Sequence, residues 1–243
     1  MSKPKTLDPM NTIHGLYCGY HNNRIKPSIV VQAYLDEIKR LNPHLGAYQD
    51  TWADTAMETA AAADKALATG LAAGPFLGVP YALKDIFHVE GKVTTCGSAA
   101  MLDNIASTTA TMVQRLKAAG GIILGKTKTV ECAFGGWGTN QKMGTPMNPW
   151  DMKTHRIPGG SSSGTAVAVA SGMAPCGMGS DTGGSIRLPA AYCGLVGLKV
   201  TVGRLPLHGI MPLSQSLDTP GPIAQTVLDC LIMFDVLDGR EGW

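Results

Sequence analysis

The sequence predicts an α/β protein in which helices cover the faces of a sheet. Short apolar runs that are typical of strands alternate along the chain with segments that have helical periodicity or are rich in alanine. The 243 residues are enough for one large core, glycine is abundant at 30 residues, and charged residues make up only 16%. This composition indicates a tightly packed chain with many short turns and argues against a disordered chain or a coiled coil.

The first 70 residues are expected to contain an irregular segment, two helices and a short strand. Residues 1–25 show no clear periodicity, so we expect them to lie over the surface. Ser28 is expected to cap a helix that ends before Pro43, and an alanine-rich helix with a solvated polar face is expected over 51–67. Residues 47–49 fit a short strand. The residues expected on the inner face of the first helix are Ile29, Ala33, Ile38 and Leu41.

Strands and helices are expected to alternate through the rest of the chain. The expected strands lie at 76–88, 122–124, 176–180 and 195–199, and the expected helices at 109–119, 165–170 and 223–237. The last helix is predicted from Ile223, Val227 and Leu231, whose spacing of four residues would place them on one inward face. No internal repeat is evident.

Charge and cysteine usage exclude several classes of function. The formal net charge is +2 with no run of basic residues, so we expect no direct contact with nucleic acid. No apolar stretch is long enough to cross a membrane, and the first 15 residues lack the apolar core of a signal peptide, so a cytoplasmic location is expected. The six cysteines show no CxxC pair and no histidine at ligand spacing, which favours reduced thiols and a protein without a metal or cofactor.

The stretch Gly159–Ala190 joins two glycine turns through a small apolar segment. Residues 159–164 read GGSSSG and residues 181–185 read DTGGS, and the residues between them predict a buried helix followed by a strand. A Gly/Ser linker would not enclose an apolar helix. The two turns therefore bring hydroxyl groups to the two ends of one helix–strand unit.

Lys84 lies within a continuous apolar run, FLGVPYALKDIFH, which leaves two interpretations open. The ammonium reaches the surface or pairs with Asp85, or the side chain is desolvated and its neutral amine acts as a base. Nucleophilic catalysis needs a hydroxyl, a base and oxyanion donors. Ser185 supplies the hydroxyl, and the amides of the turn Thr182–Gly184 supply the donors. Lysine can serve as the base for a serine nucleophile, and His88, His155 and His208 rank below Lys84 because no nucleophile elbow accompanies them.

Residues 120–127, GGIILGKT, match the spacing of a phosphate-binding loop but are predicted not to form one. That loop follows a strand and precedes a helix. Here a helix is expected before the match, and its four variable positions are themselves the expected strand. Nucleotide binding is therefore not predicted.

The motifs together resemble the amidase signature family of serine hydrolases. The resemblance rests on the serine-glycine stretch Gly159–Ala190, on FLGVPYALKDIF, on GGIILGKTKTVECAFGG, and on the later segments GLKVTVGRLP and LDTPGPIAQTVLDC. It runs in the family's order from about Ile29 to Leu237. The resemblance implies a mixed, mostly parallel central sheet flanked by helices on both faces, and cleavage of a carboxamide C–N bond in a small-molecule substrate, with no cofactor.

The resemblance also implies a role for each residue of the two turns. Lys84 is the base, Ser161 is the bridging serine after a cis Gly160–Ser161 bond, and Ser185 is the nucleophile. The implied oxyanion donors are Thr182, Gly183 and Gly184. The implied supporting residues are Ser162, Ser163, Asp181 and Arg187.

Length and one position depart from the family pattern. Members are generally about twice as long, so residues 1–243 are expected to be the N-terminal portion of a single amidase signature domain, either a fragment or a naturally short or split form. Lys128 stands where asparagine is common. An amidase, the glutaminase subunit of a tRNA-dependent amidotransferase and an inactive truncated fragment all remain open. A homodimer or a partner chain that completes the sheet is expected to cover an unfinished edge.

Overall fold

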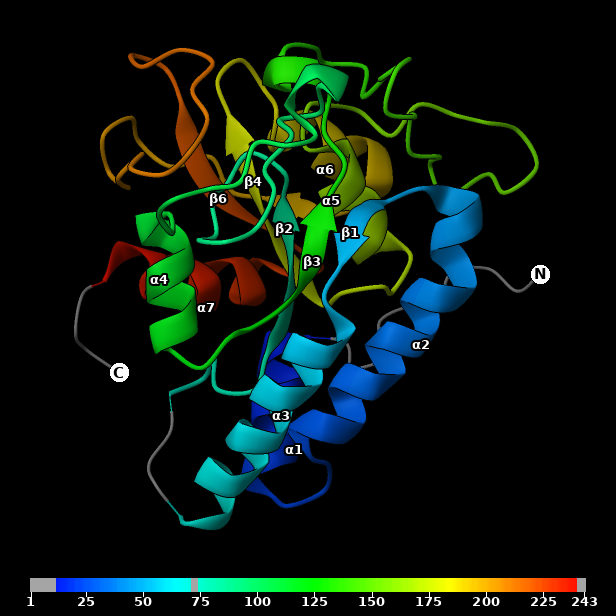
Figure 1. The fold of residues 1–243 in the computed structure, drawn as a ribbon. Helices are drawn as coiled ribbons and strands as arrows, with labels where there is room; N and C mark the ends of the chain where they lie inside the picture. The colour runs from blue at the N-terminus through cyan, green and yellow to red at the C-terminus, as the bar shows by residue number, and fades with distance from the viewer. Residues whose placement is uncertain (1–11, 71–73, 240–243) are drawn as a thin grey trace.

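A six-stranded mixed sheet forms the centre of the computed structural model, which describes residues 12–70 and 74–239 (Figure 1). The strand order is β1-β3-β2-β4-β6-β5. The strands are β1 Tyr48–Thr51, β2 Pro80–Lys84, β3 Ile122–Thr127, β4 Cys176–Asp181, β5 Val196–Gly197 and β6 Thr219–Ala224. β2 pairs in parallel with both β3 and β4, while β1, β5 and β6 pair antiparallel. The expected mixed sheet is confirmed, but parallel pairing is confined to β3, β2 and β4, and the pairings that β1, β5 and β6 make are antiparallel.

Helices cover both faces of the sheet. The α-helices are α1 Ile13–His21, α2 Pro27–Leu45, α3 Ala53–Ala68, α4 Thr111–Ala118, α5 Ser163–Ala170, α6 Arg187–Cys193 and α7 Val227–Asp238, with short 3-10 turns at Ala99–Met101 and Glu131–Ala133. Alternate residues of β2 define the two faces: Tyr81 and Leu83 pack in the cluster that contains residues of α4 and α7, whereas Ala82 packs in the cluster of α2, α3 and α5. No helix in the described ranges is long and apolar enough to span a membrane.

The N-terminal prediction of an irregular segment is wrong for residues 13–21. These residues form α1, because Thr12 caps the helix by accepting the amide of Gly15, and Ile13 and Leu16 are buried. Residues 1–11 lie outside the described residues.

The helix that follows starts and ends differently from the prediction. Pro27 occupies its first turn, so Lys26 is the N-cap, and the Ser28 hydroxyl binds the Asp64 carboxylate of α3 instead. The helix continues past Pro43 to Gly46, whose left-handed φ of 63° ends it. Ile38 and Leu41 lie on the buried face of the helix as predicted, but Ile29 and Ala33 are exposed. Val30, Val31 and Tyr34 face the core instead.

The predicted helix at 223–237 is divided between a strand and a shorter helix. Ile223 belongs to β6 and is buried against β4, although two prolines precede it in the strand. The helix α7 begins after Thr226, which caps it through the Asp229 amide. Val227 and Leu231 are exposed, so the predicted inner face is wrong; the buried residues are Asp229, Cys230, Ile232, Met233 and Leu237. The spacing of four residues from Ile223 assigned Val227 and Leu231 to the inner face of the helix. Because Ile223 belongs to β6, this spacing does not define the buried face of α7.

Candidate active site

The candidate site lies at the end of the sheet where the parallel strands have their C-termini. The arrowheads of β2, β3 and β4 point to the same edge in Figure 1. Lys84 is the last residue of β2, and Asp181 is the last residue of β4. Because neighbouring parallel strands deliver their carboxyl ends to one side, residues almost a hundred positions apart meet there.

Lys84 is fully buried and contacts two serines. Its Nζ lies 2.8 Å from Ser161 Oγ and 2.8 Å from Ser180 Oγ. Burial lowers the pKa of Lys84 to about 7, and the nearby Cys96, Asp181 and Asp218 oppose this shift. The interpretation in which Lys84 reaches the surface or pairs with Asp85 is wrong, because the side chain is enclosed and bonded to hydroxyl groups.

Ser161 is fixed by its backbone. The Gly160–Ser161 peptide bond is cis, as the family resemblance implied. The Ser161 carbonyl accepts the Thr129 hydroxyl at 2.9 Å and the Val130 amide at 3.3 Å. A Cβ on Gly160 would come within 2.6 Å of the Gly135 carbonyl oxygen, so only glycine allows the two chain segments to approach this closely.

The turn that carries Ser185 packs directly against the Ser161 turn. The Ser162 amide donates to the Ser185 carbonyl at 3.2 Å, and Ser185 is 8% exposed, whereas Ser161 is fully buried. The Ser162 hydroxyl bonds the backbone of Ser180, and the Ser163 hydroxyl donates to the Lys128 carbonyl. The contacts made by Ser162 and Ser163 therefore hold the turns in place, and Ser185 is the least buried serine of the two turns.

Asp181 and Arg187 brace the turn that carries Ser185. The Asp181 carboxylate accepts the Gly184 amide at 2.8 Å, the Ile186 amide at 3.1 Å and both Arg187 Nε and one terminal guanidinium nitrogen at 3.0 Å. Burial acts to raise the pKa of Asp181, but Arg187 and these amides hold it below its usual value. The Gly184 amide is thus occupied. Within the described part of the chain, the amides of Gly183 and Ser185 donate to no protein acceptor.

Two further contacts at this end of the sheet are not predicted by the sequence. Asp85 pairs with Lys126 of β3 at 2.9 Å, with both side chains buried, and the Asp85 carboxylate also accepts the Thr95 amide and hydroxyl. Thr182 donates its hydroxyl to Asp218, whose other oxygen accepts the Leu213 and Ser214 amides. The apolar run around Lys84 indicated a buried lysine, but no local pattern identifies partners that come from separate strands and loops.

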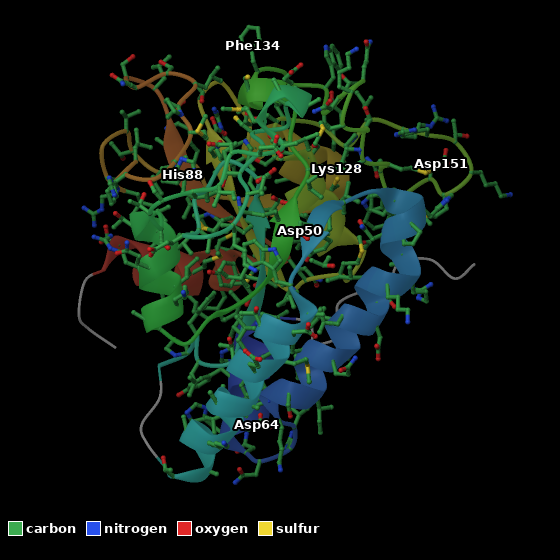
Figure 2. The ribbon with its side chains drawn as sticks, viewed as in Figure 1. Asp50, Asp64, His88, Lys128, Phe134 and Asp151 are labelled. Carbon is green, nitrogen blue, oxygen red and sulfur yellow. The ribbon has the colours of Figure 1, made fainter. Side chains whose placement is uncertain are left out.

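The remaining candidate residues lie outside this cluster. No histidine side chain in the described part of the chain bonds any of these serines, and His155 Nε2 contacts the Pro146 carbonyl at 3.4 Å. Residues 122–127 form β3, so they cannot encircle a phosphate, as predicted. Lys128, which stands where asparagine is common in the family, places its side chain beside the C-terminal end of α2. Figure 2 shows Phe134, an exposed residue, at the end of the molecule toward which β2, β3 and β4 run. Over residues 12–70 and 74–239, no His, Cys, Asp and Glu side chains gather as a metal site.

The fold and this cluster define an α/β protein that presents a buried lysine and two serine turns at one sheet edge. The family model for amidases matches residues 29–243, and the chain belongs to the amidase (amidase signature) family of hydrolases.

Relatives in this family act in different settings. The glutamyl-tRNA(Gln) amidotransferase A subunit from Chromohalobacter salexigens is 42% identical over 95% of this chain and 47% of that protein. A 2-amino-5-chloromuconic acid deaminase from Comamonas testosteroni is 46% identical over 82% of this chain and 43% of that protein. The structure of peptide amidase from Stenotrophomonas maltophilia superposes with a TM-score of 0.87 at 36% identity, covering 95% of this chain and 48% of that chain. The chain thus spans about half the length of the relatives that it matches.

Proposed function

We propose that this site hydrolyses a carboxamide C–N bond in a small molecule through an acyl-enzyme on Ser185. The observation that carries the proposal is the buried contact of 2.8 Å between Lys84 Nζ and Ser161 Oγ. A lysine with a pKa of about 7 is half neutral near physiological pH, which suits a general base.

The proposed reaction proceeds through a serine relay. Neutral Lys84 accepts the Ser161 proton while Ser161 accepts the Ser185 proton, and Ser185 Oγ attacks the amide carbonyl carbon. The Gly183 and Ser185 amides, with that of Thr182, stabilise the oxyanion, whereas the Gly184 amide shapes the turn through Asp181. The relay then returns a proton to the departing ammonia or amine. Water hydrolyses the acyl-enzyme and regenerates Ser185.

A fluorophosphonate probe followed by peptide mapping tests the nucleophile, and ammonia release from a panel of amides tests the reaction. We expect one labelled peptide that contains Ser185 and no labelling of Ser185→Ala. The rate of labelling should fall below about pH 7, because protonated Lys84 cannot accept a proton. A folded protein that reacts at no serine would favour the inactive fragment over an enzyme.

The second candidate function is the glutaminase component of an amidotransferase. It is supported by the 42% identity with an amidotransferase A subunit over 95% of this chain. In that case ammonia passes to a partner, and a partner chain or a second copy of this chain covers the unfinished edge of the sheet. Co-purification with another subunit, together with glutamine hydrolysis that depends on that subunit, would favour this function over the stand-alone amidase.

A further inference from the structure

The Lys84 amine contacts a second hydroxyl that the serine relay does not use. Ser180 Oγ lies 2.8 Å from Nζ, the same distance as Ser161 Oγ. All three side chains are buried, and Ser180 is 6% exposed. The amine is therefore held between a loop serine and a strand serine, in a place where bulk water does not supply hydrogen bonds.

The backbone of Ser180 is held by the sheet and by the Ser161 turn. It lies in β4, where it pairs with Pro220 of β6. The Ser162 hydroxyl binds both sides of the Ser180 backbone, since it accepts the Ser180 amide and donates to the Ser180 carbonyl, each at 3.3 Å. The position of the Ser180 hydroxyl thus depends on strand pairing and on a side chain from the Ser161 turn.

A neutral lysine amine has two N–H groups and one lone pair, so its rotation about the Cε–Nζ bond decides what it can do. A proton can move from Ser161 only when the lone pair faces the Ser161 hydroxyl. An N–H donated to Ser180 Oγ selects that rotation. After the transfer, the same contact becomes a charge-assisted hydrogen bond and stabilises the buried ammonium.

We propose that Ser180 is a positioning residue of the active site, which orients the Lys84 amine toward Ser161 and stabilises the ammonium formed during acylation. This inference rests on the proposed function. The other groups that face Lys84 are Cys96, Asp181 and Asp218. Asp85 is adjacent in sequence but is paired with Lys126.

The pH dependence of Ser185 labelling by a fluorophosphonate tests this role without knowledge of the substrate. In Ser180→Ala the Lys84 ammonium loses a hydrogen-bond acceptor, so the acid limb, the fall in labelling rate toward low pH, should move to lower pH by roughly one unit. The labelling rate on the plateau above this limb should fall roughly tenfold. Ser180→Thr keeps the hydroxyl and should restore both values. A role confined to packing would lower the rate without moving the limb.

Thr165→Val is the matched control, because Thr165 is also buried and its hydroxyl bonds Thr127 Oγ at 2.7 Å and the Met178 carbonyl at 3.3 Å, whereas the Lys84 amine bonds Ser161 and Ser180. Its acid limb should coincide with that of the parent chain. If Ser180→Ala does not fold, Ser180→Cys retains the size with a weaker acceptor and should shift the limb in the same direction. If the parent protein is labelled normally and the acid limb does not move in Ser180→Ala or in Ser180→Cys, the inference is overturned and the proposed function stays intact. Absence of labelling in the parent would reject both.

Discussion

Lys84 is the residue on which the proposed chemistry depends, because its surroundings favour the neutral amine and place the Ser161 hydroxyl beside it. Burial at the end of a central strand lowers its pKa, and the Ser161 turn places a hydroxyl 2.8 Å from the amine. An exposed lysine in the same sequence position would be protonated at neutral pH and would not act as a base. The position of the residue at the end of β2 is thus part of the catalytic proposal.

The first prediction concerns Lys84 and Ser161 as one relay. Lys84→Met and Ser161→Ala should each lower amide turnover by roughly 10²–10⁴-fold, because either change interrupts the same proton path. The double variant should be little worse than the worse single variant, since residues that act as a unit are not additive. Steady-state kinetics of the three variants measures this. Losses that multiply in the double variant would show that the two residues act independently.

The second prediction concerns the buried pair of Asp85 and Lys126. Lys126→Met leaves the Asp85 carboxylate buried without its cation, and this should lower the free energy of unfolding by about 3–5 kcal/mol. Arg156→Met is the control, because its pair with Asp151 is largely exposed and should contribute at most about 1 kcal/mol. Urea denaturation compares them. Equal losses in the two variants would mean that burial adds nothing to the Asp85–Lys126 pair.

At the scale of the elements, the sequence predicts best those that a local pattern defines. The strands β2, β3 and β4 and the helices α3, α4 and α5 agree with apolar runs, alanine content and glycine stops. The sequence does not predict the helix α6 or the strand β6, because α6 lies directly after the turn that carries Ser185 and β6 contains two prolines. β6 forms through pairing with β4, and no local propensity shows that pairing.

In the candidate site too, residues that a local pattern marks are predicted from the sequence, and contacts between distant elements are not. The two serine turns and Lys84 are recognisable from residue type and setting, and the resemblance gives each a role. Ser180, Asp218 and the Asp85–Lys126 pair are contacts between elements, so their identification required the strand order. Occupation of the Gly184 amide by Asp181 is likewise a matter of side-chain direction.

The third prediction tests how α5 is held against the sheet. A Cβ on Gly164 would lie 2.3 Å from the Ala47 carbonyl oxygen and 2.6 Å from the Lys128 amide, which are backbone atoms that cannot move aside independently. Gly164→Ala should therefore destabilise the fold by about 1–3 kcal/mol or more and slow Ser185 labelling, because α5 carries the Ser161 turn. Gly74→Ala is the control, since no atom of the described residues lies within 4 Å of its added Cβ. Thermal melts that match for the two variants would contradict this account of α5 packing.

For the whole molecule, the buried lysine links the proposed chemistry to stability. Lys84 is the last residue of β2, a strand from which Tyr81, Ala82 and Leu83 pack in the apolar clusters on both faces of the sheet, and its side chain is fully buried. Unfolding returns the side chain to water, where its pKa is 10.5, whereas in the folded chain it is about 7. Between these two values the unfolded state binds more protons than the folded state, so the Lys84 contribution to the free energy of unfolding rises with pH and is least favourable below pH 7.

The fourth prediction follows from this linkage. The free energy of unfolding of the parent chain minus that of Lys84→Met should increase as the pH is raised from about 7 toward 10.5, and should be flat below pH 7, where Lys84 is protonated in both states. Groups that titrate alike in both proteins cancel in the difference. Urea denaturation at a series of pH values measures it. A difference that stays constant across this window would mean that Lys84 titrates alike in the folded and unfolded chain, and the neutral amine required by the serine relay would then be absent at physiological pH.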